Sequence, residues 1–565
     1  MNLNIKAKAE HTYDAIVIGT GISGGWAAKE LCERGLKTLV LDRGRNVEHV
    51  KDYPTAMKHS WELPHRGKVP AEELKNYPIQ KRAGYFDQTN KHWWVNDLEN
   101  PYTQDNPFNW IRGYHVGGKS LMWSRQCYRL SDLDFTANAK DGHGVDWPIR
   151  YADIAPWYDK VEKFAGINGN KDGLPQLPDG EFLPPMEMTC LEKHVAKRIK
   201  EKFTDRVMII GRSANLTQAV PGRGQCQYRN RCIRGCPFGA YFSSNSSTLP
   251  AAAATGNMTL RPHSIVNEII YDDKTQKASG VRIIDAETNE VMEFYAKIVF
   301  VNASTIASSF ILLNSTSERF PNGIGNDSGE LGHNLMDHHH LAGANAWSEE
   351  FADKYHYGRR PNGIYIPRFR NISEQRSDYV RGFGYQGGSG RESWTRGESM
   401  ALLGADLKNA LTDPGPWTMG INGFGEFLPH HDNRVYLNHD VKDKWGQSTL
   451  SIDCKIRENE KAMRKDMTES AAEILEAAGL KDVNPWHREF TPGMGIHEMG
   501  TARMGRDPAT SVLNGNNQMH AVKNVFVTDG SCMTSSANQN PSLTYMALTA
   551  RAAHFAVDEL NRRNL

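Results

Sequence analysis

The chain has 565 residues, enough for about four domains of average size or for fewer large ones. Its 67 Lys and Arg residues nearly balance 66 Asp and Glu residues, and the formal net charge of +1 argues against binding to nucleic acids or anionic membranes. The mean hydropathy is low, at -0.59, and no run approaches the roughly 18 apolar residues of a membrane-spanning helix, so we expect a soluble protein without a membrane span.

The N-terminus shows no export signal of its own. It contains a few lysines but no apolar segment before the first predicted strand, and no pair of arginines. The sequence therefore leaves two locations open: the cytoplasm, or the periplasm after export with a partner subunit that carries the signal.

A strand, a tight glycine turn and a helix come first in the chain. Residues 14–18 form a short apolar run, the sequence GTGISG follows at residues 19–24, and an Ala- and Leu-rich helical stretch comes next. In such a turn Gly19 permits the bend, Gly21 lets the backbone approach a pyrophosphate, and Gly24 lets the helix pack on the strand. The pattern predicts a dinucleotide-binding unit.

The acid after the second predicted strand indicates the kind of dinucleotide. Residues 37–41 form this strand, and Asp42 follows it, 23 residues after Gly19, a separation typical of an acid that binds ribose hydroxyls. An acid at this place disfavours a 2′-phosphate, so NAD or the ADP half of FAD fits better than NADP.

A second glycine loop and two later strands indicate a large cofactor site. The sequence RGYHVGGKS at residues 112–120 has paired glycines followed by a hydroxyl, which suits a loop lying flat against a planar cofactor. Apolar runs at residues 297–302 and 524–528 predict further buried strands, and Asp529 follows the second. Because the predicted strands are spread along the whole chain, we expect a discontinuous cofactor domain.

Three of the eight cysteines stand within eleven residues. Cys226, Cys232 and Cys236 are separated by five and three residues, and a proline follows the last. Thiolates ligate iron–sulfur clusters or zinc, and three thiols suit a [3Fe–4S] cluster. A zinc site with a fourth ligand and a loop of reduced thiols stay open. A cluster would lead electrons from a flavin to a cytochrome or quinone-linked acceptor and would favour a dehydrogenase over an oxidase.

Two later segments carry weaker signals. Residues 351–408 are rich in Tyr, Phe, Arg and Gly, which suits either a sugar-binding surface or an ordinary aromatic antiparallel sheet. Residues 458–480 have apolar positions at helical spacing and predict a surface helix packed on the core. The histidine tract at residues 338–340 is not expected to hold a metal, because side chains alternate along a strand.

Five motifs occur here in the order seen in the glucose-methanol-choline (GMC) oxidoreductases, which the sequence resembles over nearly its whole length: GTGISG, RGYHVGGKS, GHNLMDH, HEMGTARMG and NPSLT. The resemblance implies an α/β, Rossmann-like FAD-binding domain and an interleaved α+β substrate domain on an antiparallel sheet. The FAD domain would comprise residues 1–135, 205–335 and 496–565, with the cysteine loop inserted at 222–240. The substrate domain would comprise residues 136–204 and 336–495.

The resemblance also implies the site residues. It places the catalytic base at His497 and a partner that orients the substrate oxygen at Asn540, at the start of a long C-terminal helix. A histidine suits this role because it can take the hydroxyl proton near neutral pH while a hydride passes to flavin N5. The residues expected to bind FAD are Gly19, Gly21, Ser23, Gly24, Asp42, Arg43, Arg112, Gly117, Gly118, Ser120, Val266, Asp529, Gly530, Asn540, Pro541 and Thr544.

One position departs from a part of the family. Where the sugar-oxidising pyranose oxidases carry a histidine bonded covalently to FAD, this chain has Met122. We therefore predict that FAD is bound non-covalently.

The cysteine spacing resembles that of the bacterial cytochrome-linked sugar dehydrogenases of this family, with Cys226, Cys232 and Cys236 as the implied metal ligands. We therefore predict an FAD-dependent enzyme that oxidises a ring hydroxyl of a sugar or glycoside, with C1, C2 and C3 open and C3 of glycosides favoured. The expected partners are a cytochrome c acceptor and a small subunit that carries the export signal. The alternatives are an oxygen-using sugar or alcohol oxidase, and a non-catalytic flavin subunit that only relays electrons.

Overall fold

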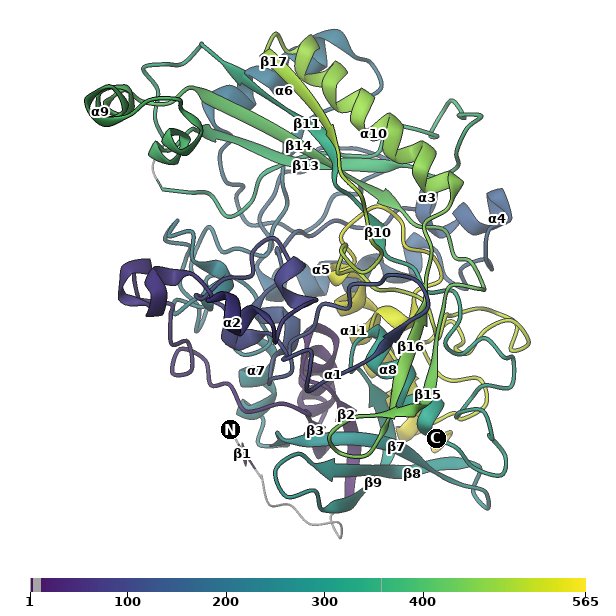
Figure 1. Ribbon diagram of the computed structural model, residues 1–565. Coiled ribbons are helices and arrows are strands. Elements are labelled where there is room, and N and C mark those ends of the chain that lie inside the picture. The colour runs from purple at the N-terminus through teal and green to yellow at the C-terminus, as the bar shows by residue number, and fades with distance from the viewer. Residues whose placement is uncertain (1, 4–11, 357) are drawn as a thin grey trace.

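The computed structural model describes residues 2–3, 12–356 and 358–565. Two large sheets dominate the molecule, a mainly parallel one in the lower half of Figure 1 and an antiparallel one in the upper half. Within the described residues, no helix is both long and apolar enough to cross a membrane.

The first sheet has the strand order β1-β6-β3-β2-β9-β8-β7, and β18 also pairs with β9. Strands β6, β3, β2, β9 and β18 run parallel, while β7, β8 and β9 pair antiparallel. The strands are β1 (Asn2–Leu3), β2 (Thr12–Ile18), β3 (Thr38–Leu41), β6 (Met258–Arg261), β7 (Ser264–Asp272), β8 (Lys277–Asp285), β9 (Val291–Val301) and β18 (Val525–Val527). The four predicted strands of the cofactor domain are thus confirmed as β2, β3, β9 and β18, and they lie in one sheet.

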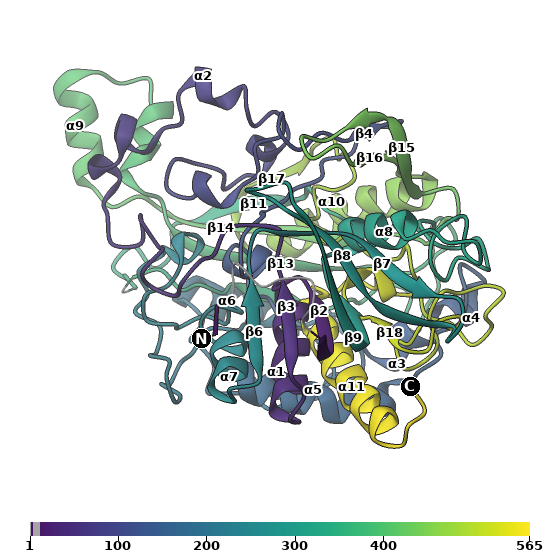
Figure 2. The same cartoon turned by 90° about the horizontal axis from the view of Figure 1, so that it is seen from below.

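Helices gather beside the parallel strands (Figure 2). These are α1 (Ile22–Glu33), α5 (Tyr151–Ala165), α7 (Thr248–Ala254) and α11 (Ser542–Asn561). Helix α1 packs against both α7 and α11, and α11 also packs against α5. Ten of the twelve residues of α1 are buried, as expected of a helix enclosed on several sides.

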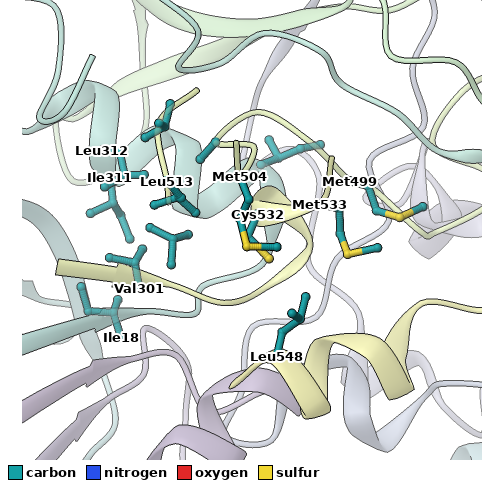
Figure 3. Packing of buried hydrophobic residues seen from close by; sticks show 14 of the residues in the cluster. Ile18, Val301, Ile311, Leu312, Met499, Met504, Leu513, Cys532, Met533 and Leu548 are labelled. Atoms are coloured by element: carbon teal, nitrogen blue, oxygen red, sulfur yellow. The ribbon is translucent and has the colours of Figure 1, made fainter. Parts of the chain in front are cut away.

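The core joins segments that are far apart in the chain (Figure 3). Ile18 at the end of β2 and Val301 at the end of β9 belong to the same buried cluster as Leu548 of α11. Ile311 and Leu312 of α8 (Thr305–Asn314) belong to the same cluster. This packing makes one hydrophobic core out of β2, the middle of the chain and the C-terminal segment.

The second sheet has the order β17-β11-β14-β13-β12-β5, and β10 also pairs with β14. Its strands are β5 (Ile209–Ile210), β10 (His338–His339), β11 (Ala342–Ser348), β12 (Ile364–Ile366), β13 (Phe383–Arg391), β14 (Trp417–Glu426) and β17 (Lys481–His487). All pairs are antiparallel. Helix α10 (Glu458–Ala477) packs on β11, β14 and β17 and against α6 (Cys190–Lys202), which confirms the predicted surface helix.

Smaller elements complete the fold. A third sheet joins β15 (Arg434–Lys442), β16 (Ser448–Asp453) and β4 (Thr103–Gln104). Short helices α2 (Ala71–Leu74), α3 (Asp132–Phe135) and α4 (Ala137–Asp141) lie in the connections, and α9 (Gly404–Thr412) projects from the body in Figure 1. Strand β5 falls within the range 205–335 that the sequence assigns to the FAD domain, yet it pairs with β12 of the antiparallel sheet.

Candidate active site

A cavity of about 1730 Å³ lies where the two large sheets meet. Its wall includes the carboxyl ends of β2 and β3, the residues after β9, and residues of β13 and β14. Parallel sheets bind ligands at the carboxyl ends of their strands, and a site there can reach residues of the second sheet. The volume suits a dinucleotide together with a small substrate.

The glycine turn at residues 19–24 has the geometry that its sequence predicts. Gly19 has a φ of +99°, which favours glycine, and a Cβ on Gly24 would lie 2.0 Å from the carbonyl oxygen of Gly19. A Cβ on Gly21, by contrast, would meet no protein atom within 4 Å, and Gly21 lines the cavity at the N-terminus of α1. Gly19 and Gly24 are therefore required by the backbone fold, whereas Gly21 leaves room for an anionic group at the start of the helix.

Gly21→Ala separates cofactor binding from folding. The φ of −64° at Gly21 suits alanine, so the variant should fold and melt like the wild type without cofactor. Its methyl group would enter the space left for the pyrophosphate, and we expect FAD affinity to fall roughly tenfold or more, about 1.4 kcal/mol. Equilibrium dialysis with FAD measures this. Gly84→Ala, at an exposed position with free space, is the matched control, and equal FAD binding by both variants would contradict the prediction.

Asp42 stands at the end of β3 and is connected to the paired glycines. The Thr20 hydroxyl donates to its carboxylate, the Gly44 N–H donates to it at 2.9 Å, and the Gly117 N–H donates to Thr20 Oγ1 at 2.8 Å. Burial raises the pKa of Asp42. The acid, the turn and the glycine loop therefore form one bonded unit in the cavity wall.

Most residues predicted to bind FAD line the cavity. These are Gly19, Gly21, Ser23, Asp42, Arg43, Arg112, Gly118, Ser120, Val266, Asp529, Gly530, Asn540 and Pro541. Three others, all within the described ranges, do not line it: Gly24, Gly117 and Thr544. Gly117 faces Asn245, and the Thr544 hydroxyl bonds the Tyr158 hydroxyl at 2.8 Å, so both act through packing.

Buried polar atoms in the wall are consistent with a polar cofactor. Asn302 Oδ1, Glu498 Oε1 and His115 Nε2 are buried, belong to cavity-lining residues and have no hydrogen-bond partner in the part of the chain that the structure describes. Buried polar atoms are normally paired, so a bound molecule with donors of its own would satisfy them. With the glycine turn and Asp42, this wall fits FAD.

His497 and Asn540 lie side by side at the cavity. Asn540 Nδ2 is 3.4 Å from His497 Nε2, and Gln386 Nε2 of β13 donates to Asn540 Oδ1 at 2.5 Å. Both predicted residues are therefore brought together, although 43 positions separate them. Gln386, which sequence reasoning did not assign to the site, is the next residue of the same chain of bonds.

His338 determines which nitrogen of His497 carries the proton. His338 Nε2 lies 3.1 Å and 2.9 Å from the carbonyl oxygens of Ser536 and Ala537, and because carbonyls only accept, this nitrogen carries the hydrogen. His338 Nδ1 is then an acceptor in the neutral ring and receives the Nδ1–H of His497 at 2.9 Å. His497 Nε2 is left with a free lone pair directed toward Asn540.

Burial keeps both histidines neutral. It lowers the pKa of His338 to about 4, and burial together with His338 and Lys119 lowers the pKa of His497 well below its usual value. Near pH 7, His497 is therefore an unprotonated acceptor, which is the state that a general base needs.

Asp337 holds the backbone that carries His497. Its carboxylate accepts the N–H groups of Gly493, Gly495 and His497 at 2.8, 3.0 and 3.1 Å. Asp337 and His338 belong to the motif GHNLMDH, and the sequence alone indicates no chemical role for them. The motif GHNLMDH was the available signal, but its contact with a loop 160 residues later could not be seen in it.

The cysteine loop lies beside the cavity, and Cys232 lines it. Cys226 is buried, and burial with the nearby Cys232 and Cys236 raises the pKa of its thiol to about 11. All eight cysteines are free thiols. Among the described residues, no group of three or more His, Cys, Asp or Glu side chains is arranged to hold a metal ion, so the three thiols do not form a ready ligand set.

The arginines between these cysteines bond to residues outside the cysteine loop. Arg229 donates to the carbonyl oxygen of Ala56 at 2.8 Å, and Arg234 donates to that of Lys58 at 3.0 Å. Arg231 lies 3.0 Å from His59 Nδ1. These bonds attach the cysteine loop to the segment 56–59, in which Ala56 is buried and residues 57–59 are exposed.

Comparison with known proteins identifies relatives over the whole chain. Two family models described as GMC oxidoreductase match residues 13–340 and 429–549. The 2-methyl-1,2-propanediol dehydrogenase of Mycolicibacterium austroafricanum is 28% identical, and the alignment covers 96% of this chain and 94% of the relative. The fructose dehydrogenase large subunit of Gluconobacter japonicus is 26% identical, with 97% and 98% covered.

A solved structure has the same fold. Formate oxidase of Aspergillus oryzae RIB40 matches with a TM-score of 0.61 at 14% identity, covering 98% of this chain and 100% of its own. At this identity the match concerns the fold alone.

Proposed function

Because this chain belongs to the GMC oxidoreductase family and is an FAD-dependent enzyme that acts on CH–OH groups, we propose that it is a dehydrogenase that oxidises a ring hydroxyl of a sugar or glycoside. The observation that carries the proposal is the pair of His497 Nε2 and Asn540 Nδ2 at the cavity wall, 3.4 Å apart. A hydroxyl between these atoms can give its proton to one and accept a hydrogen bond from the other. His497 is the proposed base and Asn540 the residue that orients the substrate oxygen.

The chain's own residues prepare the proton transfer. His338 keeps the proton of neutral His497 on Nδ1, so Nε2 is free to take the hydroxyl proton. Asn540 Nδ2 donates to the oxygen as negative charge develops on it. The charge that appears on His497 is stabilised because His338 Nδ1 accepts from its Nδ1–H. FAD, when bound, supplies the acceptor for the hydride.

The cavity wall supports a polar substrate. Beside Asn540, the side chains of Gln386 on β13 and Thr418 on β14 are on the same face of the sheet, line the cavity and can bond hydroxyl groups. Several such groups in a partly apolar pocket suit a molecule with many hydroxyls. Similarity to fructose dehydrogenase supports a sugar, and similarity to 2-methyl-1,2-propanediol dehydrogenase makes a small diol the second substrate class to test.

Anaerobic bleaching of the flavin by candidate alcohols tests the proposal. The panel contains methyl glucoside, lactose, glucose, gluconate, fructose and 2-methyl-1,2-propanediol, and product NMR identifies the oxidised carbon. We expect glycosides to bleach the flavin fastest, with a C3 ketone as product. Bleaching by the small diol alone would replace the sugar proposal, and bleaching by none would favour the electron-relay alternative.

The proposed iron–sulfur cluster is supported by the sequence spacing of the three cysteines and by the position of their loop beside the cavity. Cys226, Cys232 and Cys236 lie close enough to influence one another electrostatically, and their loop borders the cavity. We propose that a [3Fe–4S] cluster gathers these thiols and that the acceptor is a cytochrome c. The proposal includes a small partner subunit that carries an export signal.

Iron content decides this point. Protein made with iron and sulfide available should contain about three iron atoms per flavin, as a [3Fe–4S] cluster requires. The triple variant Cys226→Ser, Cys232→Ser, Cys236→Ser should lose the iron and retain FAD, while Cys190→Ser, outside the loop, should keep both. The proposal of a cluster-linked dehydrogenase would be overturned if the wild-type protein contained no iron or acid-labile sulfide. It would also be overturned if the protein consumed oxygen as fast as it reduced dye acceptors.

Non-covalent attachment of FAD follows from Met122, a thioether that lines the cavity where a covalent link would need a nucleophile. Trichloroacetic acid should therefore release all the flavin into the supernatant. A yellow pellet would show a covalent bond formed by another residue and would disprove the prediction.

A further inference from the structure

We propose that Gln386 is a positioning residue that sets the orientation of the Asn540 amide and thereby keeps its N–H directed at His497 and at the substrate oxygen. The inference rests on the proposed roles of His497 and Asn540. It places a residue of the antiparallel sheet among those that orient the proposed base and its partner.

The hydrogen bonds form one chain with a single direction. Gln386 Nε2 donates to Asn540 Oδ1 at 2.5 Å, and Asn540 Nδ2 faces His497 Nε2 at 3.4 Å. His497 Nδ1 donates to His338 Nδ1 at 2.9 Å, and His338 Nε2 donates to the carbonyl oxygens of residues 536 and 537. Those backbone carbonyls cannot reverse their role, so they fix one end of the chain.

The other end depends on Gln386. An asparagine amide can turn over and exchange its oxygen and nitrogen, and such a turn would place Oδ1 of Asn540 against the lone pair of His497 Nε2. A donor at Oδ1 prevents this, because the turned amide would then direct its N–H groups at another N–H. Gln386 is the residue that supplies the donor.

The backbone of Gln386 is held in the sheet on both sides. It lies in the middle of β13, where its backbone pairs with Tyr365 of β12 on one side and with Asn422 of β14 on the other. Its side chain lines the cavity and is half-buried. The strands on both sides fix the backbone that carries the side chain, and the bond to Asn540 Oδ1 orients its amide.

Gln386→Glu tests the direction of the bond while preserving shape. A carboxylate at this position cannot donate, so Asn540 Oδ1 would face another acceptor and the amide would turn over. At pH 8 we expect the rate of anaerobic flavin reduction by the best alcohol of the panel to fall about 100-fold, the size expected for loss of one aligned donor. As the pH falls from 8 to 5, a growing share of the half-buried carboxyl becomes protonated, because an ordinary Glu has a pKa of about 4.3. Its O–H then donates to Asn540, and the rate relative to the wild type at the same pH should recover at least tenfold.

Gln386→Leu is the matched variant, because it lacks a donor at every pH. Its rate relative to the wild type at the same pH should stay low from pH 8 to pH 5. FAD content, reduction by dithionite and thermal melting of all three proteins report on folding.

The outcomes separate this inference from the proposed function. If wild-type flavin is bleached by no alcohol, the proposed function fails whatever the variants do. If wild-type flavin is bleached, two results would overturn the role of Gln386: a Gln386→Glu rate within threefold of the wild type at pH 8, or a loss that lower pH does not relieve.

Discussion

His497→Ala is expected to reduce the rate of flavin reduction by the alcohol substrate by about 10³-fold, within the range of 10²–10⁴ that a general base contributes. The reason is that His497 Nε2 lies beside Asn540 with its lone pair free to take the proton, because the ring carries its hydrogen on Nδ1. Stopped-flow bleaching under anaerobic conditions measures the rate. Reduction by dithionite and FAD content should equal those of the wild type, since neither requires a base.

The pH profile of the wild type checks the same assignment. Because burial lowers the pKa of His497 well below 6.5, the base is already free of its proton at pH 6, and kcat/KM should be flat from pH 8 to pH 6. At lower pH the ring takes a proton and kcat/KM should fall. Retention of more than a tenth of the wild-type rate by His497→Ala would argue for a different base. A fall centred near pH 7 would instead report on Asp337, whose pKa burial raises to about 7.

His338→Leu is expected to lower the same rate about 100-fold, although His338 lies on the far side of His497 from the substrate. Without an acceptor for the Nδ1–H, the neutral ring of His497 is free to carry its proton on Nε2, and the charged ring formed during the reaction loses its partner. The leucine also leaves the carbonyl oxygens of Ser536 and Ala537 without their donor.

A conservative variant distinguishes this role from simple packing. His338→Asn keeps an oxygen near the position of Nδ1, so it can still accept from His497, and it should retain most of the activity. Both variants should bind FAD, and their thermal melting should be compared. Equal loss of rate in His338→Leu and His338→Asn would indicate that His338 acts only through packing.

Sequence patterns with local causes were predicted well. The strands that became β2, β3, β9 and β18 are continuous apolar runs, because strands buried on both faces need no polar alternation. At Gly24 the steric limit acts within six residues, through the carbonyl oxygen of Gly19, whereas a Cβ on Gly19 would meet the carbonyl oxygen of Asn302. Helix α10 follows from its apolar spacing.

The parts of the site that depend on distant contacts could not be predicted. His338 stands in a run of three histidines, and nothing in that run indicates that the first meets His497 and the third bonds the Met494 carbonyl. Nor does it indicate that the ring of the second is buried with no hydrogen-bond partner among the described residues. Thr544 was expected at the cofactor, but its position on α11 turns it toward Tyr158. The cysteine spacing shows how many thiols stand close together in the sequence, but not whether they converge on one metal site.

The pairing of β18 with β9 has a consequence for the synthesis of the protein. A ribosome delivers residues in order, and the parallel sheet lacks one of its strands until residue 527 has left the exit tunnel. The base, the amide beside it and helix α11 arrive within the same last stretch. Nascent chains that stop earlier would therefore expose an open sheet edge, and cofactor loading should follow synthesis of β18 and α11 rather than precede it.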